Sequence, residues 1–182
     1  MKNKVVLHQF VLIGVLVVVT AWKLITGREF LGADLVWWWL GAIIGFLIVF
    51  ADRLVYILLM RDEPLSKKFG EMFSGGRYLQ SVEALMYERY EQKELVMRSA
   101  LFIFAWVIMA VFAATSVNNP FGRGFILGLG THLTFDLISD YYGNKERFNL
   151  WFWQVKRELP EGEKSLFVLV MAVAFIFLGF IL

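Results

Sequence analysis

The sequence contains no cysteine, two histidines and few charged residues. The absence of cysteine excludes a disulfide framework, a thiolate metal site and a cysteine nucleophile. Charged residues make up 19% of the 182 residues, whereas hydrophobic residues make up 59% and the mean hydropathy is +0.63. A soluble domain of this size carries more charge than that. The composition therefore predicts an integral membrane protein.

The net charge is also small, at +2. The lysines and arginines form no basic stripe, so the sequence does not predict binding to nucleic acid. Membrane lipids are the predicted partners, and the sequence leaves oligomerisation open. The way in which the basic residues are distributed along the chain is more informative than their sum.

Long apolar runs predict an all-α, polytopic membrane helical bundle with five transmembrane helices in a single domain, residues 1–182. Each run is long enough to cross about 30 Å of hydrocarbon at about 1.5 Å per residue. The first run is interpreted as a retained helix rather than a signal peptide, because no small-x-small cleavage motif precedes Trp22 and Lys23. The predicted spans are residues 5–26, 35–60, 99–117, 121–140 and 165–182.

Two polar segments, residues 61–98 and 141–164, are predicted to be cytoplasmic. Short cytoplasmic loops are rich in lysine and arginine, and the N-terminus and these segments hold fourteen such residues against three on the other side. The N-terminus is therefore predicted to be cytoplasmic and the C-terminus outside the cell membrane. Within the first segment, Pro64 and three glycines are expected to interrupt regular structure, and residues 77–97 are predicted to form an amphipathic helix.

One stripe of small and ionisable residues is predicted on the fourth span. Gly124, Gly128, His132, Asp136 and Asp140 are four residues apart, and side chains at that spacing lie on one face of a helix. The two glycines are expected to allow close helix packing. His132 and Asp136 are therefore expected to face protein rather than lipid.

The predicted topology places Asp52 of the second span at the same depth as His132, Asp136 and Asp140. A carboxylate at membrane depth is costly, so a partner is expected. One imidazole and several carboxylates match the ligands of a hydrolytic metal site. The histidine favours Zn²⁺, and the oxygen ligands favour Mn²⁺ or Mg²⁺.

Two other polar residues in apolar runs have simpler interpretations. Arg53, near the end of the second span, is expected to extend its guanidinium toward water, as long basic side chains do at membrane boundaries. His8 is interpreted as a boundary residue at the start of the first span.

Several motifs together resemble those of a known family. The segments LGAIIGFLIVFADRL, MRSALF and GLGTHLTFDLISD, followed by LWFW, are similar to segments of the predicted membrane-bound metal-dependent hydrolases, which include LexA-regulated bacterial members. The resemblance covers about residues 40–153. It implies a glycine-containing span that ends in an acidic segment, a loop with histidine, and a helix with a G-x-x-x-H-x-x-x-D motif.

The resemblance assigns catalytic and metal-binding roles to Asp52, His132 and Asp136, and Asp140 is a further candidate metal ligand. The sequence departs from the pattern at Met97-Arg98-Ser99, where Arg98 stands in place of a loop histidine. Arg98 is instead a candidate for binding substrate phosphate, because a guanidinium binds phosphate through two parallel hydrogen bonds. Arg53 is a second candidate for that role.

Three functional hypotheses remain open at this stage. The first is a membrane-embedded, metal-dependent hydrolase that acts on a phosphorylated or lipid substrate at the cytoplasmic face. The second is a non-catalytic helical membrane protein, in which the stripe of His132 and Asp136 fixes helix packing and the basic cytoplasmic helix docks lipid or a partner. The third is a proton or ion pathway lined by the same two residues.

Overall fold

The computed structural model describes residues 2–26, 32–87 and 95–182, with side chains described from residue 7 onward except at 86 and 87. In these ranges all of the regular structure is α-helical, which confirms the predicted all-α class. The chain forms two compact units, Met1–Val49 with Arg98–Leu182, and Phe50–Met97. The prediction of a single membrane domain stays a prediction.

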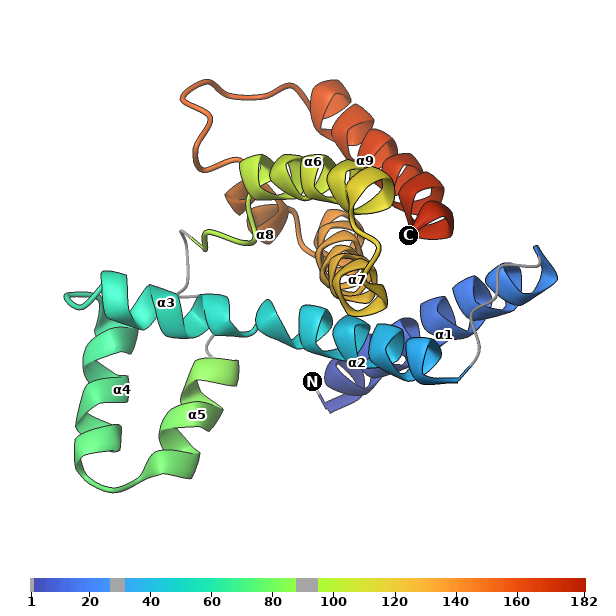
Figure 1. Ribbon diagram of the computed structural model, residues 1–182. Helices are drawn as coiled ribbons and strands as arrows, with labels where there is room; N and C mark the ends of the chain where they lie inside the picture. Colours follow the sequence, from blue (N-terminus) through green and yellow to red (C-terminus); the bar gives the residue numbers. More distant parts are fainter. Residues whose placement is uncertain (1, 27–31, 88–94) are drawn as a thin grey trace. The chain divides into compact units, whose positions relative to one another are not determined.

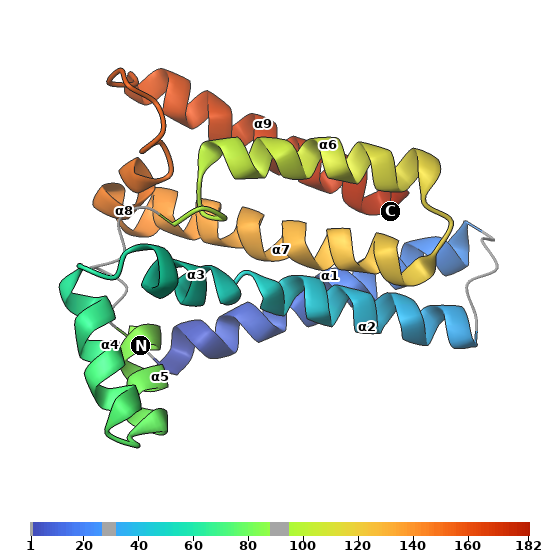
Figure 2. The same cartoon turned by 60° about the vertical axis from the view of Figure 1, so that its left-hand side comes forward.

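The first unit is built around α7 (Pro120–Gly143). In two views α7 lies between α1 and α2 on one side and α6 and α9 on the other (Figure 1, Figure 2). The surrounding helices are α1 (Lys2–Ile25), α2 (Ala33–Ile48), α6 (Ala100–Ser116), α8 (Lys145–Leu150) and α9 (Glu161–Ile181). Helix α7 packs against all of these, and its own buried polar side chains are Thr131, His132, Thr134 and Asp136.

Glycines allow α2 and α7 to approach each other closely. A methyl group at Gly124 would overlap the main-chain oxygen of Trp38, and one at Gly128 would overlap that of Ala42. Gly41 and Gly45 of α2 have the same relation to the backbone of α7. Small residues on both helices let the two backbones touch, as in membrane helix pairs of the small-xxx-small type. The predicted packing role of Gly124 and Gly128 is thus confirmed.

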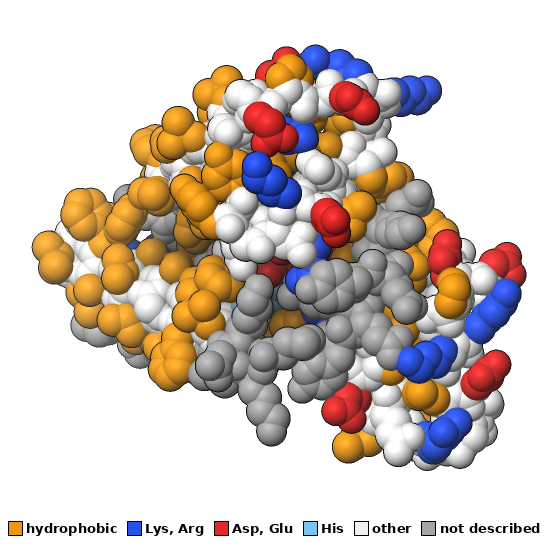
Figure 3. Space-filling view, turned by 180° about the vertical axis from the view of Figure 1, so that it is seen from behind, with side chains coloured by type: hydrophobic (Ala, Val, Ile, Leu, Met, Phe, Trp, Pro, Cys, Tyr) orange, Lys and Arg blue, Asp and Glu red, His pale blue; other side chains and the backbone are white. Residues whose placement is uncertain are grey.

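Three described helical stretches are long and apolar enough to cross a membrane, which is compatible with a membrane protein. They are Leu7–Ile25, Ala33–Leu59 and Glu161–Ile181, and α6 is a shorter apolar helix. In the space-filling view hydrophobic side chains lie together on the left, and the charged side chains in view gather away from them (Figure 3). The predicted number of five spans is not settled by these stretches.

The second unit contains α3 (Ala51–Leu59), α4 (Pro64–Ser74) and α5 (Tyr78–Tyr87). Tyr56, Leu65, Leu85 and Leu95 form its apolar core. The expected interruption after Pro64 is wrong, because this proline occupies the first turn of α4, where a missing N–H costs no hydrogen bond. Of the predicted amphipathic helix 77–97, α5 accounts for the first half, and residues 88–94 lie outside the described residues.

Candidate metal and anion site

Helix α7 presents His132 and Asp136 on one face, one turn apart. The helix begins at Pro120, and the side chain of Asn119 accepts a hydrogen bond from the main-chain N–H of Phe121. Asn119 therefore caps the first turn, and proline at the next position suits the start of a helix. His132 is 0% exposed and Asp136 2% exposed, so both side chains face protein, as the sequence predicted.

A main-chain carbonyl group orients the ring of His132. Its Nδ1 lies 2.8 Å from the main-chain oxygen of Phe46 in α2. Because a carbonyl oxygen can only accept, Nδ1 carries a proton, and in the neutral ring Nε2 then presents its lone pair. The lone pair is on the side of Asp136, whose Oδ2 lies 3.4 Å from Nε2. Histidine ligands of metal ions are commonly oriented by such a second hydrogen bond.

His8 of α1 completes the group. It is 8% exposed, and its Nε2 lies 2.7 Å from Oδ1 of Asp136. Its ring contacts that of Phe135 edge to face, at 4.4 Å between centroids, and lies 5.3 Å from the ring of His132. The interpretation of His8 as a boundary residue at the start of the first span did not include this contact with Asp136. Its place on the buried face of α1 together with Leu12 was the signal that could have found it.

The fourth member is Arg98, which is 6% exposed. Its Nε donates to Oδ2 of Asp136 at 2.6 Å, and its Nη2 lies 3.5 Å from Nε2 of His132. The next residue, Ser99, caps α6 through a hydrogen bond from the N–H of Phe102, which fixes the chain at this point. Within the described part of the chain, Nη1 of Arg98 is buried without a hydrogen-bond partner.

The His8, His132 and Asp136 side chains can hold a metal ion. All three are buried, and one ligand atom from each lies within 4.8 Å of the others. Two imidazole nitrogens and one carboxylate oxygen are a common ligand set of zinc sites in enzymes. The buried guanidinium of Arg98 adds a positive charge next to the same carboxylate. Metal-ligating groups and a cationic group thus meet at one place in the first unit.

The structure gives the remaining candidate residues other contacts. Both carboxylate oxygens of Asp52 accept main-chain N–H groups in the second unit, from Val96 at 3.1 Å and Met97 at 3.0 Å. Arg53 is 3% exposed, with its guanidinium carbon 5.4 Å from the centre of the Phe50 ring, so the expected extension toward water is wrong.

Asp140 lies one turn beyond Asp136 on α7, outside the group of three ligands. Its Oδ2 accepts a hydrogen bond from Nε1 of Trp151 at 3.1 Å. Trp151 is 1% exposed, and its main-chain oxygen accepts from the N–H of Ala100 at 2.7 Å. Asp140 therefore ties Trp151, which follows α8, to α7, and Trp151 in turn binds the first residue of α6.

Comparison with known proteins identified no relative: no family model, no curated protein and no solved structure matches the chain. The resemblance to the membrane-bound metal-dependent hydrolases therefore stays a prediction.

Proposed function

We propose that the chain is a multi-pass membrane protein that binds a divalent metal ion and hydrolyses a phosphorylated lipid at the cytoplasmic face of the membrane. The observation that carries the proposal is the convergence of His8 and Asp136, 128 residues apart in sequence, with His132 in a buried group of ligand atoms. Burying two imidazoles and a carboxylate is costly unless they have partners. A shared cation would provide such a partner.

The donor set fits a metal ion. His132 is held by the Phe46 carbonyl in the orientation that ligation by Nε2 requires, and His8 reaches the same carboxylate from another helix. Two imidazoles favour Zn²⁺ over Mn²⁺ and Mg²⁺, although all three remain candidates. Three protein ligands leave a coordination position for water, and a bound metal lowers the pKa of that water and polarises a phosphoryl oxygen.

Arg98 is proposed to bind the phosphate of the substrate. Its Nε is used by Asp136, whereas Nη1 is buried without a partner in the described residues. A guanidinium in this position donates to an anionic oxygen and keeps it beside the carboxylate and imidazoles. A phosphorylated substrate is proposed because of this Arg98 guanidinium.

The membrane arrangement is part of the proposal. The three long apolar stretches, together with α6 and α7, would give five spans, with the N-terminus cytoplasmic. His8, near the start of α1, then lies in the cytoplasmic leaflet. The excess of lysine and arginine in residues 61–98 and 144–164 supports this orientation.

Metal analysis of detergent-purified protein tests the proposal. We expect about one equivalent of metal in the wild type, and loss of the metal in the His132→Ala and Asp136→Asn variants. Release of inorganic phosphate from phosphatidic acid in mixed micelles should fall in parallel. Phe10→Ala is the matched control, because Phe10 is 67% exposed on α1, two residues from His8. A wild type without metal, or phosphate release that is unchanged in both site variants, would contradict the proposal.

One observation favours a second, non-catalytic candidate. The 2.6 Å contact between Arg98 and Asp136 already neutralises the carboxylate without any ion. The cluster would then fix the packing of α1, α2 and α7, as buried polar residues do in membrane bundles. In that case Asp136→Asn would lower the thermal stability in detergent of a wild type that contains no metal.

A further inference from the structure

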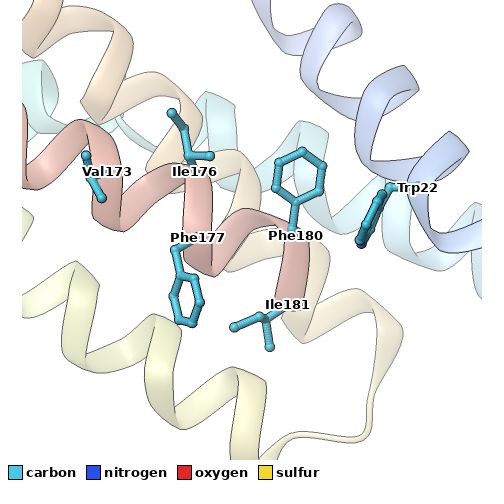
Figure 4. A pocket seen from close by; sticks show the side chains of 6 residues that line it. All are labelled: Trp22, Val173, Ile176, Phe177, Phe180 and Ile181. Atoms are coloured by element: carbon cyan, nitrogen blue, oxygen red, sulfur yellow. The ribbon is translucent and has the colours of Figure 1, made fainter. Parts of the chain in front are cut away.

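An apolar cavity of about 560 Å³ lies between the C-terminal ends of α1 and α9. Trp22 of α1 forms one wall and faces Phe180 of α9, with ring centroids 5.5 Å apart (Figure 4). The rest of the lining comes from Val173, Ile176, Phe177 and Ile181 of α9. All of the lining side chains are apolar.

A second cavity of about 220 Å³ continues along α1 toward its N-terminus. It shares Ile176 and Phe180 with the first cavity, and Leu127 of α7 contributes to its lining. On the side of α1 it is lined by Gly14, Val15, Val18 and Val19. The two cavities therefore adjoin each other at Ile176 and Phe180, and we name them together the α1–α9 groove.

The groove and the polar site share one face of α1. His8, Val15 and Trp22 are seven residues apart, a spacing that keeps side chains on nearly the same face of a helix. His8 contacts Asp136, Val15 lines the smaller cavity, and Trp22 lines the larger one. Along α1 the polar site at His8 is thus followed by the apolar linings of the two cavities.

We propose that the α1–α9 groove binds an acyl chain of the phosphorylated lipid whose headgroup is held at Arg98. This inference rests on the proposed function, to which it adds the position of the substrate tail. A phosphorylated lipid has an anionic head and a hydrocarbon tail. It therefore matches the change along α1 from the polar site at His8 to the apolar α1–α9 groove. Both walls belong to stretches that are apolar and long enough to cross a membrane, Leu7–Ile25 and Glu161–Ile181. A groove between two such helices opens to hydrocarbon.

The thickness of one membrane leaflet agrees with the distance along α1 from His8 to the smaller cavity. One leaflet contributes about half of the roughly 30 Å hydrocarbon core, and at about 1.5 Å per residue this equals about ten residues of helix. A chain that begins beside His8 and follows α1 therefore reaches Val18, within the smaller cavity. The larger cavity at Trp22 would take the end of a longer chain.

Gly14 offers a variant that fills the groove without disturbing the fold. A side chain at this glycine meets no atom within 4 Å, yet Gly14 lines the smaller cavity. Gly14→Phe should therefore occupy the space of the acyl chain. Gly162→Phe is the matched control, because Gly162 is a helical glycine of α9 with equally open surroundings and does not line either cavity.

The experiment uses the full chain in lipid nanodiscs that contain phosphatidic acid with a photoreactive diazirine near the end of one acyl chain. Peptide mapping by mass spectrometry should place the label on residues of the groove, such as Val18 and Ile176. Labelling there should be largely lost in Gly14→Phe, because the phenyl ring occupies the space of the chain, and should be unchanged in Gly162→Phe. Diacylglycerol with the same chain should label the groove much less, because it lacks the phosphate.

Three results would overturn the inference: label spread equally over exposed residues of α6 such as Phe104, unchanged labelling in Gly14→Phe, or equal labelling by diacylglycerol. Metal content, measured on the same samples, separates this inference from the proposed function. Groove labelling by phosphatidic acid in a protein without metal would support the lipid site and contradict the hydrolase. A metal-containing protein without groove labelling would contradict the acyl-chain site and leave the proposed metal site unaffected.

Discussion

Nε2 of His8 lies 2.7 Å from Oδ1 of Asp136, and this contact joins the first helix of the chain to the helix at the centre of its first unit. Nε of Arg98 binds the other oxygen of the same carboxylate at 2.6 Å. Asp136 thus joins three segments of the first unit. Each of its contacts provides a separate test of what the site does.

His8→Ala is expected to weaken metal binding as much as His132→Ala does. Loss of one of three protein ligands should lower the affinity for Zn²⁺ by at least the roughly 10- to 100-fold that is typical for loss of a supporting residue. Isothermal titration of the metal-depleted protein with Zn²⁺ measures this change. The surface variant Phe10→Ala should bind as the wild type does, and a His8→Ala variant with undiminished affinity would remove His8 from the ligand set.

Arg98→Ala should destabilise the protein unless a metal ion takes over the charge of Arg98. Removing one partner of a buried ion pair leaves the Asp136 carboxylate uncompensated, at a cost of about 3–5 kcal/mol. We expect a lower thermal midpoint in detergent, and recovery of most of that loss when Zn²⁺ is added.

The double variant Arg98→Ala/Asp136→Asn controls for this rescue. It lacks both the cation and the charged ligand, so Zn²⁺ should restore little of its stability. Equal recovery of the single and double variants would show that the added metal acts elsewhere in the protein.

Gly128→Ala tests the close approach of α2 and α7. Because the added methyl group would overlap the main-chain oxygen of Ala42, the helices must separate, and we expect a loss of about 1–3 kcal/mol, as in overpacked cores. Gly14→Ala is the control, since its surroundings are open and alanine favours a helix over glycine by about 1 kcal/mol. Thermal unfolding in detergent should therefore move in opposite directions for the two variants. A Gly128→Ala protein as stable as the wild type would contradict the packing.

The sequence could predict the helices and the face that carries the site, but not every member of the site. Gly128, His132 and Asp136 belong to one helix. Because a helix has a fixed period, their spacing alone places them on the same face. The contact of His8 depends on how α1 packs against α7, about which local spacing says nothing.

Arg98 was a different case, since its replacement of a histidine drew attention to it. Its pairing with Asp136 nevertheless depends on where α6 begins, which Ser99 determines through its cap. The helix that starts at Pro64 was missed because proline was interpreted as a breaker. At the first turn of a helix, proline instead favours the helix.

Asp52→Asn should loosen the second unit and leave metal binding unchanged. Its two carboxylate oxygens accept the N–H groups of Val96 and Met97, and charge-assisted bonds of this kind contribute about 1.5–3 kcal/mol. An amide side chain can accept through one oxygen only, so one of the two N–H groups loses its partner. Hydrogen exchange at Val96 or Met97 should therefore become faster, while exchange in α7 and the affinity for Zn²⁺ stay as in the wild type. A fall in metal affinity would instead make Asp52 a ligand, as the sequence alone suggested, and would require the second unit to contribute directly to the site.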